Sequence, residues 1–206
     1  RDSSTSRGLG DVYKRQIIER MNYHDYMWDL GGTLLDNYEM SAQAFVKTLA
    51  EFGQSASHDE VYNKLKESTD AAIAQFIPNE PQFLKAYKKL EAEYLKTPVL
   101  FAGAHDVLQA IVASGGRNFL VSHRNKQVLD ILEKTNLLSY FTEVVTSENG
   151  FSRKPSPESM LYLKEKYDIK EALVIGDREI DRKAGQAAGF DTLLVDGKKS
   201  LMEIVK

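Results

Sequence analysis

Short apolar runs and segments with a helical period alternate along this 206-residue chain. The first run ends at a carboxylate, as expected for a buried strand that delivers a polar residue at its carboxyl end. Five such runs predict strands, at residues 23–29, 118–121, 143–146, 172–175 and 192–195. Helices are expected between the later runs, at residues 105–113, 126–134, from 156 onward and 180–188. Strands separated by helices in this way predict an α/β fold with a parallel sheet covered on both faces.

A continuous helical stretch interrupts this alternation after the first strand. Four helices are expected in it, starting near residues 39, 57, 71 and 81. Ser57 followed by Glu60 forms a capping-box sequence, and Pro81 fits the first turn of the last helix. The apolar stripe of that helix consists of Phe83, Tyr87, Leu90 and Tyr94. The sequence thus predicts a Rossmann-like core, formed by residues 17–36 and 100–206. An all-helical cap, residues 37–99, is inserted into it.

Polar residues follow three of the predicted strands directly. These are Asp29, Ser122 and Asp177. In a parallel sheet, ligands bind outside the carboxyl ends of the strands, so these side chains are candidates for one site. An aspartate can act as a nucleophile, and the glycines after Asp29 let main-chain N–H groups approach an anion. The sequence therefore favours a site where Asp29 meets a phosphate.

The segment Asp29–Thr33 resembles the first motif, Asp-x-Asp-Gly-Thr, of the haloacid dehalogenase-like (HAD) hydrolases. Asp29 stands at the nucleophile position and Thr33 at the threonine. The three later motifs of that family are matched, in order, by Ser122, by Lys154 and by the pair Asp177 and Asp181. Each motif alone is weak, but four in the right order with a helical insert after the first make a specific resemblance.

The resemblance implies a role for each matched residue. Ser122 would hold phosphoryl oxygens, Lys154 would neutralise nucleophile and phosphate together, and Asp181 would orient the lysine or a metal-bound water. Magnesium, which takes oxygen ligands, would be bound by Asp29, Asp177 and the carbonyl of Gly31. The substrate phosphate would be bound by Gly32, Thr33, Ser122, His123 and Lys154. A catalytic role for His123 is not expected.

One residue departs from the family pattern, because Gly31 stands where the phosphatases have a second aspartate. In those phosphatases, that aspartate is the general acid that protonates the leaving oxygen. A positioned general acid typically raises the reaction rate by about 100-fold to 10,000-fold. A phosphatase of small phosphorylated metabolites, similar to the phosphoglycolate phosphatase-like subgroup, is the first interpretation. A second is a carbon–phosphorus hydrolase similar to phosphonoacetaldehyde hydrolase, which needs a Schiff-base lysine from the cap. Lys64 and Lys66 lie there, but both fit a solvated helix face. A third is a protein that binds phosphate but has lost turnover.

The Gly176-Asp177 pair resembles the metal-binding form of the fourth motif and argues against metal-free dehalogenation.

The composition of the chain limits which partners and sites are expected. The formal net charge is −3 and Lys and Arg form no run, which argues against a nucleic-acid partner. The chain has no cysteine, so a disulfide framework and a thiolate zinc site are excluded.

No apolar run reaches the roughly 18 residues of a membrane span, and no secretory leader is recognised. We therefore expect a cytoplasmic protein without a membrane partner, and the sequence leaves its oligomeric state open.

Residues 1–16 are expected to lie outside the fold, because Ser6–Gln16 is what one reading frame of a common transposon-based sequencing adapter would encode. Met21 is the expected native start.

Overall fold

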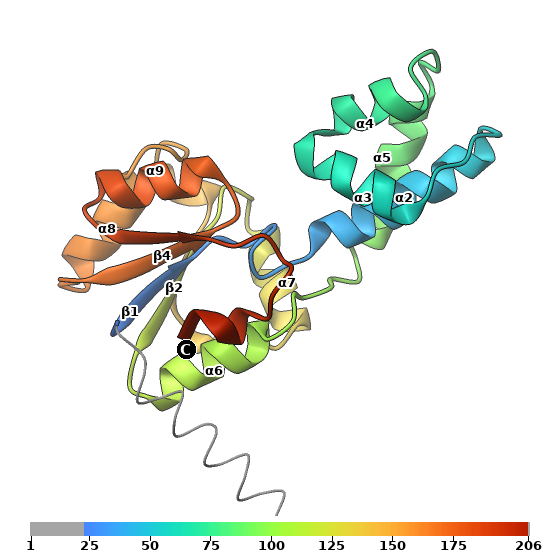
Figure 1. Cartoon of the computed structure of the whole chain (residues 1–206). Helices are drawn as coiled ribbons and strands as arrows, with labels where there is room; N and C mark the ends of the chain where they lie inside the picture. Colours follow the sequence, from blue (N-terminus) through green and yellow to red (C-terminus); the bar gives the residue numbers. More distant parts are fainter. Residues whose placement is uncertain (1–22, 206) are drawn as a thin grey trace, which may run out of the picture. The chain divides into compact units, whose positions relative to one another are not determined.

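The computed structural model of the chain describes residues 23–205, so the predictions for residues 1–16 and Met21 lie outside it. The described chain forms two compact units (Figure 1). One unit contains residues 23–34 and 100–205, and the other is Leu35–Val99.

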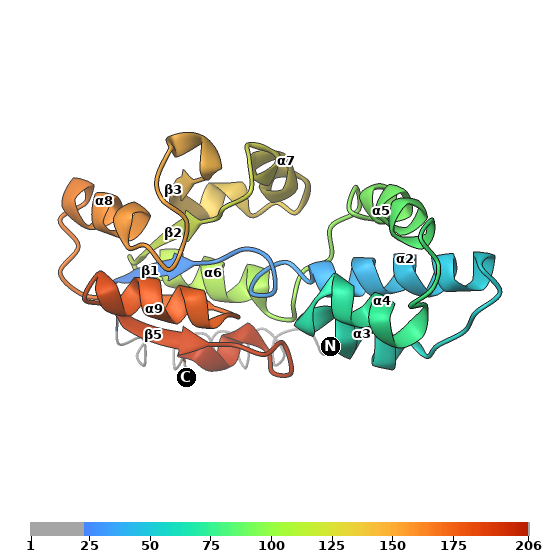
Figure 2. The same ribbon diagram turned by 90° about the horizontal axis from the view of Figure 1, so that it is seen from above.

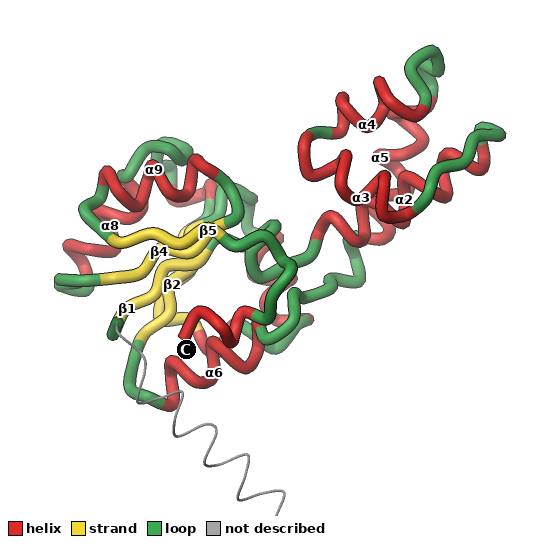
Figure 3. Tube along the Cα trace, viewed as in Figure 1, coloured by secondary structure: helices red, strands yellow, loops and turns green. Residues whose placement is uncertain are grey.

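The first unit is built on a sheet of five parallel strands in the order β3-β2-β1-β4-β5 (Figure 3). The strands are β1 Asp25–Trp28, β2 Arg117–Val121, β3 Phe141–Val145, β4 Ala172–Gly176 and β5 Asp191–Leu194. The central strand β1 is buried along its whole length. Its last residue, Trp28, pairs in register with Leu120 of β2 and Ile175 of β4. The α/β fold predicted from the sequence is confirmed, and the carboxyl ends of these three strands meet at one edge.

Helices cover both faces of this sheet (Figures 1 and 2). One face carries α8 Glu158–Lys166 and α9 Glu179–Ala187, and the other carries α6 Ala104–Ala113 and the 3-10 helix η3 Leu201–Val205. The remaining helices are α7 Gln127–Lys134 and the 3-10 helices η1 Leu138–Tyr140 and η2 Ser147–Asn149. One apolar cluster lies under α8 and α9 and includes Met27, Phe119 and Val174, all buried. Alternate positions of β1, β2 and β4 therefore contribute to this core, because successive side chains of a strand point to opposite faces of the sheet.

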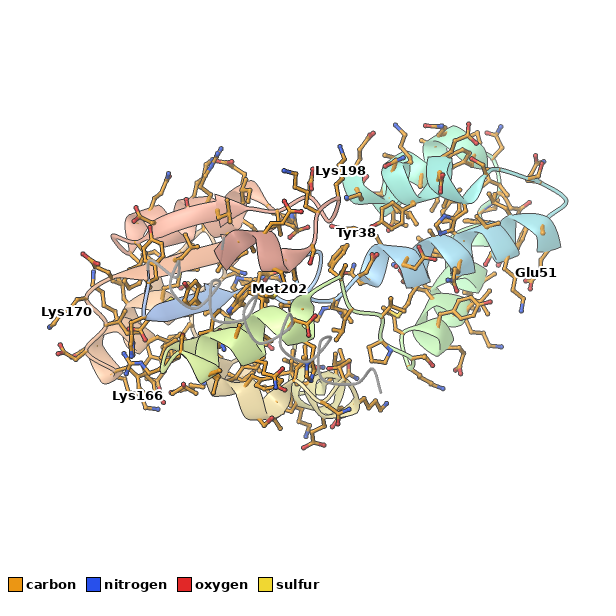
Figure 4. The ribbon with its side chains drawn as sticks, turned by 60° about the horizontal axis from the view of Figure 1, so that its bottom comes forward. Tyr38, Glu51, Lys166, Lys170, Lys198 and Met202 are labelled. Carbon is orange, nitrogen blue, oxygen red and sulfur yellow. The ribbon has the colours of Figure 1, made fainter. Side chains whose placement is uncertain are left out.

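The second unit consists of helices alone. They are α2 Asn37–Glu51, α3 His58–Glu67, α4 Thr69–Phe76 and α5 Phe83–Tyr94. Figure 4 labels Tyr38 and Glu51 near the two ends of α2. The predicted capping box is present, since Ser57 accepts from the Glu60 amide and the Glu60 side chain accepts from the Ser57 amide. The predicted stripe of α5 packs into the core of this unit, with Phe83 and Tyr87 fully buried.

Two helix starts were predicted wrongly, both at a proline. Pro81 is not in the first turn of α5, because Phe83 N donates to Glu80 O and closes a turn before the helix begins. The helix expected from residue 156 onward begins instead at Glu158, and Pro157 is the residue before α8. Both prolines supply a fixed φ that suits the entry to a helix, so the sequence signal was real but displaced by one or two positions.

The connections between the two units are held on both sides by backbone hydrogen bonds. Asp36 N donates to Val99 O (2.8 Å) within the helical unit, and Phe101 N donates to Leu34 O (2.9 Å) within the sheet unit. The two chain segments therefore run side by side where the insert leaves and rejoins the first unit. In the described part of the chain, no helix is long and apolar enough to cross a membrane.

Candidate active site

The loop after β1 continues the strand by one residue and then turns sharply. Asp29 N donates to Ile175 O (2.9 Å), and the amide of Leu34 closes the turn on Leu30 O (3.0 Å). Gly32 has a φ of 83°, and a Cβ built there would collide with the carboxylate of Asp177. A side chain at Gly32 would thus be strained and would displace that carboxylate. The turn therefore brings the chain after Asp29 directly against Asp177.

Lys154 is the centre of the polar contacts in this region. Its side chain is buried, and Nζ donates to Asp29 Oδ1 and to Asp181 Oδ1, each at 2.5 Å. Nζ also donates to the carbonyl of Val121 (3.1 Å), at the end of β2. Burial alone would lower the pKa of Lys154, but the two carboxylates outweigh it and raise the pKa above its ordinary value. Lys154 is therefore a fixed positive charge between two aspartates.

Asp29 lies in an environment that opposes its ionisation in part. Burial raises the pKa of the Asp29 carboxyl; the Lys154 ammonium opposes this, and the nearby Asp181 carboxylate adds to it. Ligand atoms of Asp29, Asp177 and Asp181 all lie within 4.8 Å of one another. Three carboxylates thus lie together in one cluster, and oxygen ligands so placed could hold a divalent cation.

Asp181 is held from two sides. One carboxylate oxygen accepts from Lys154, and the other accepts from the amide of Arg178 (3.1 Å) at the start of α9. Gly176 makes this possible, since a Cβ there would collide with the side chain of Asp181. This arrangement suits the expected role of Asp181 as the residue that orients the lysine.

Ser122 and His123 follow β2 at the same edge of the sheet. Ser122 N donates to Val145 O (2.9 Å), and its buried hydroxyl oxygen accepts from the amide of Arg124 (3.2 Å). His123 Nε2 accepts from the backbone amide of Lys154 at 2.6 Å. Burial, and then the charges of Lys154 and Arg153, lower the pKa of His123 to about 4. The imidazole is therefore neutral near pH 7.

Thr33 completes the set of residues in the first loop. It is fully buried, and its hydroxyl oxygen has no hydrogen-bond partner among residues 23–205. A buried hydroxyl in that state costs free energy, which a polar ligand or a water molecule would recover. The Thr33 hydroxyl is thus available to form a hydrogen bond with an oxygen-rich ligand.

The structure brings Asp29, Lys154, Asp177 and Asp181 into one cluster, and Gly32 lies against it. The strand register puts Ser122 at the same edge as Asp29. Contacts of Ser122, Thr33 and His123 with a substrate, and of the Gly31 carbonyl with a metal, stay predictions. Sequence reasoning missed the link between His123 and Lys154, because nothing in a pattern joins residues 31 positions apart through one amide.

Comparison with known proteins places this geometry in context. The family described as haloacid dehalogenase-like hydrolase matches residues 26–195. A phosphoglycolate phosphatase from Aquifex aeolicus is 29% identical over 181 residues, which cover 82% of each chain. A pyrophosphatase from Bacillus cereus is 24% identical over 181 residues, covering 85% of this chain and 84% of its own. The crystal structure of a hydrolase from Streptococcus pneumoniae is 61% identical, with a TM-score of 0.84, and covers 89% of this chain and 97% of its own.

Proposed function

Since the chain belongs to the haloacid dehalogenase-like hydrolase family, we propose that it is a Mg²⁺-dependent phosphatase of small phosphorylated metabolites, working through an aspartyl-phosphate on Asp29. One observation carries the proposal: Lys154 bridges Asp29 and Asp181 at 2.5 Å beside the carboxylate of Asp177. The names of the Aquifex and Bacillus relatives, a phosphoglycolate phosphatase and a pyrophosphatase, support phosphoryl groups as the substrate class.

The reaction has two steps. A carboxylate oxygen of Asp29 attacks phosphorus, and the bond from phosphorus to the leaving oxygen breaks. Water then attacks the aspartyl-phosphate, which releases inorganic phosphate and regenerates Asp29. Lys154 keeps one Asp29 oxygen in place, and its charge offsets the anionic phosphate in both steps. Asp181 holds Lys154 in that position, since both of its own carboxylate oxygens accept hydrogen bonds from protein donors.

The residues present fit a magnesium ion. Carboxylate and carbonyl oxygens are its preferred ligands, and ligand atoms of three carboxylates lie within 4.8 Å of one another. Asp29, Asp177 and the Gly31 carbonyl would hold it. When bound, the ion would polarise the phosphoryl group and offset its charge. Asp181 keeps its hydrogen bond from Lys154 in this assignment and need not be a metal ligand.

The missing acid at Gly31 has a consequence for the substrate. An alkoxide leaving group would have to take its proton from water or from the substrate itself, so alkyl esters would react slowly. Acyl, aryl and anhydride leaving groups need no such help. The carbon–phosphorus hydrolase alternative gains no support from its two lysines, since Lys64 pairs with Glu67 (3.0 Å) and Lys66 is exposed. A Schiff-base lysine is instead usually desolvated.

The test is phosphate release, with and without Mg²⁺, from phosphoglycolate, a sugar phosphate, an acyl phosphate, an aryl phosphate, pyrophosphate and phosphonoacetaldehyde. We expect release that needs Mg²⁺ and that Asp29→Asn abolishes, while Asp191→Asn on the exposed edge strand leaves it unchanged. Release from phosphonoacetaldehyde alone would favour the alternative hydrolase. No release from any compound, with phosphate still raising the melting temperature, would identify a binding protein. Wild-type turnover by Asp29→Asn would overturn the mechanism.

A further inference from the structure

The imidazole of His123 accepts a hydrogen bond from the main chain at Lys154. His123 Nε2 lies 2.6 Å from Lys154 N, and the two residues come from the loop after β2 and the loop before α8. A main-chain amide is always a donor, so Nε2 must offer its lone pair and the ring proton must sit on Nδ1. The contact therefore requires the neutral ring in one tautomer.

The surroundings of His123 keep the ring in that form. Burial lowers its pKa to about 4, and the positive charges of Lys154 and Arg153 act in the same direction, while Asp181 opposes them. At neutral pH the ring is uncharged and Nε2 is available as an acceptor. The hydrogen bond is thus compatible with the electrostatics around it.

Lys154 depends on where its backbone is held. Its flexible side chain must present one ammonium to Asp29 and Asp181 at 2.5 Å each. Other contacts of the loop before α8 tie it to that helix, as where Ser152 N donates to Glu158 Oε2 (2.8 Å). His123 ties the loop to the end of β2 instead, next to Ser122. It joins the strand that carries one predicted phosphate ligand to the residue that carries the lysine.

We infer that His123 is a positioning residue, which fixes the Lys154 backbone so that its ammonium bridges Asp29 and Asp181 during phosphoryl transfer. The inference rests on the proposed function and adds a residue to it. Misplacing a catalytic group by about 1 Å can cost about 100-fold in rate. Loss of the acceptor should therefore lower kcat by about 10-fold to 100-fold while KM changes little.

Three variants at position 123 distinguish the effect of the hydrogen bond from the effect of side-chain size. Gln at position 123 can put an amide oxygen near the position of Nε2, Asn is too short to reach it, and Phe keeps the ring without an acceptor. We expect His123→Gln to keep most of the wild-type kcat, and both His123→Asn and His123→Phe to lose it. His105→Gln, at an exposed position of α6, controls for removal of an imidazole. Equal kcat in the Gln and Phe variants would overturn the inference.

A second readout does not depend on activity. Hydrogen exchange of the Lys154 amide, measured by NMR on the full chain, should be faster in His123→Phe and His123→Asn than in the wild type and His123→Gln. Unchanged exchange in all variants would overturn the inference, whatever the enzyme assay gives. Protection by His123 without any phosphate release would leave the positioning intact and refute the proposed function. If Phe unfolds the chain, the Asn and Gln pair still decides.

Discussion

Gly31 and Gly32 are neighbours in the loop after β1, but their backbones differ. Gly32 has a φ of 83°, whereas Gly31 is not among the glycines with positive φ. Gly32 also faces the Asp177 carboxylate too closely for any side chain. The left-handed backbone favours glycine at position 32 only, so the backbone at position 31 can accept another residue. Position 31 is the one to which the family resemblance assigns the general acid.

Gly31→Asp should therefore restore a proton donor for the leaving oxygen. We expect it to raise kcat for alkyl phosphates by up to about 100-fold to 10,000-fold and to change the rate for acyl phosphates much less. Gly31→Asn has nearly the same size but no proton to give, and it is the matched control. Steady-state rates on a sugar phosphate and an acyl phosphate measure the effect. Equal gains with Asp and Asn would show that proton donation is not what the wild type lacks.

His123 predicts a pH dependence of stability whose sign follows from its lowered pKa. The folded-state pKa is about 4 against an ordinary value of 6.5, so between these pH values the unfolded chain binds a proton that the folded chain does not. The stability that neutral His123 contributes is complete above pH 6.5 and falls as the pH falls toward 4. His123→Gln lacks this term, so its urea midpoint should change less than that of the wild type between pH 7 and 4.5. Parallel curves for the two proteins would contradict the assignment of a neutral, buried ring.

At this scale the sequence predicted which residues form the site better than how they contact one another. Asp29 and Asp177 could be found because each directly follows an apolar strand. The hydrogen bond from Arg178 N to Asp181 and that from Lys154 N to His123 could not. Both depend on loop conformation, which no hydrophobic period encodes.

Regular elements were predictable where the hydrophobic period was long enough. All five strands and the longer helices were recognised, because each carries a run or period of apolar residues. The 3-10 helices at Leu138–Tyr140, Ser147–Asn149 and Leu201–Val205 were missed. Helices of three to five residues do not complete enough turns to display a period. The limit of prediction therefore lies in short turns rather than in the layers.

Helices α2 and α5 share a half-buried carboxylate. Glu91 Oε1 accepts from Ser41 Oγ (2.7 Å) and from Tyr87 OH (2.6 Å), and Lys88 Nζ pairs with Oε2 (2.7 Å). Burial tends to raise the pKa of Glu91, but the hydrogen bonds from Lys88, Tyr87 and Ser41 outweigh it and lower the pKa. The ionised form therefore stabilises the contact between the two helices.

Glu91→Gln should destabilise the helical unit by about 1–3 kcal/mol at pH 7, because two hydroxyl donors and one ammonium lose their charged acceptor. A carboxylate with a lowered folded-state pKa gives stability above its unfolded value near 4.5 and loses it as the pH falls through the folded value. The difference in stability between variant and wild type should thus shrink as the pH falls below 4.5. Hydrogen exchange in α2 and α5 measures it. Glu93→Gln, on the exposed face of α5, is the control and should be near neutral.

At the scale of the described chain, residues 23–205, each of the two units contains an apolar cluster of its own. The core around Met27, Phe119 and Val174 lies in the sheet unit, and the core around Phe45 and Phe83 lies in the helical unit. The insert is closed at its base by backbone pairs on both sides. The sequence indicated this division because the strand alternation stops after the first strand and resumes near residue 100. Which loop contacts form at the edge of the sheet had to come from the structure.

Two cores of this kind should unfold separately. Phe45 is fully buried, with its ring centroid 4.8 Å from that of Phe83 and 5.0 Å from that of Tyr87, so Phe45→Ala should cost the helical unit about 3–5 kcal/mol. Trp28 is the single tryptophan of the chain and is buried in the sheet unit, where its Nε1 donates to Asn118. Its fluorescence therefore reports that unit alone, while hydrogen exchange in α2–α5 reports the other.

Phe45→Ala should increase exchange throughout α2–α5 and leave the urea midpoint of Trp28 fluorescence almost unchanged. Phe119→Ala, a fully buried residue of β2, is the reciprocal variant and should lower the fluorescence midpoint first. When the helical unit unfolds, it becomes a long loop whose ends are still held by the sheet unit. Because the entropic cost of closing a loop rises only slowly with its length, we expect the sheet unit to stay folded. If both variants move both probes together, the insert and the sheet unit are one cooperative structure, and the separation of their cores does not extend to their stability.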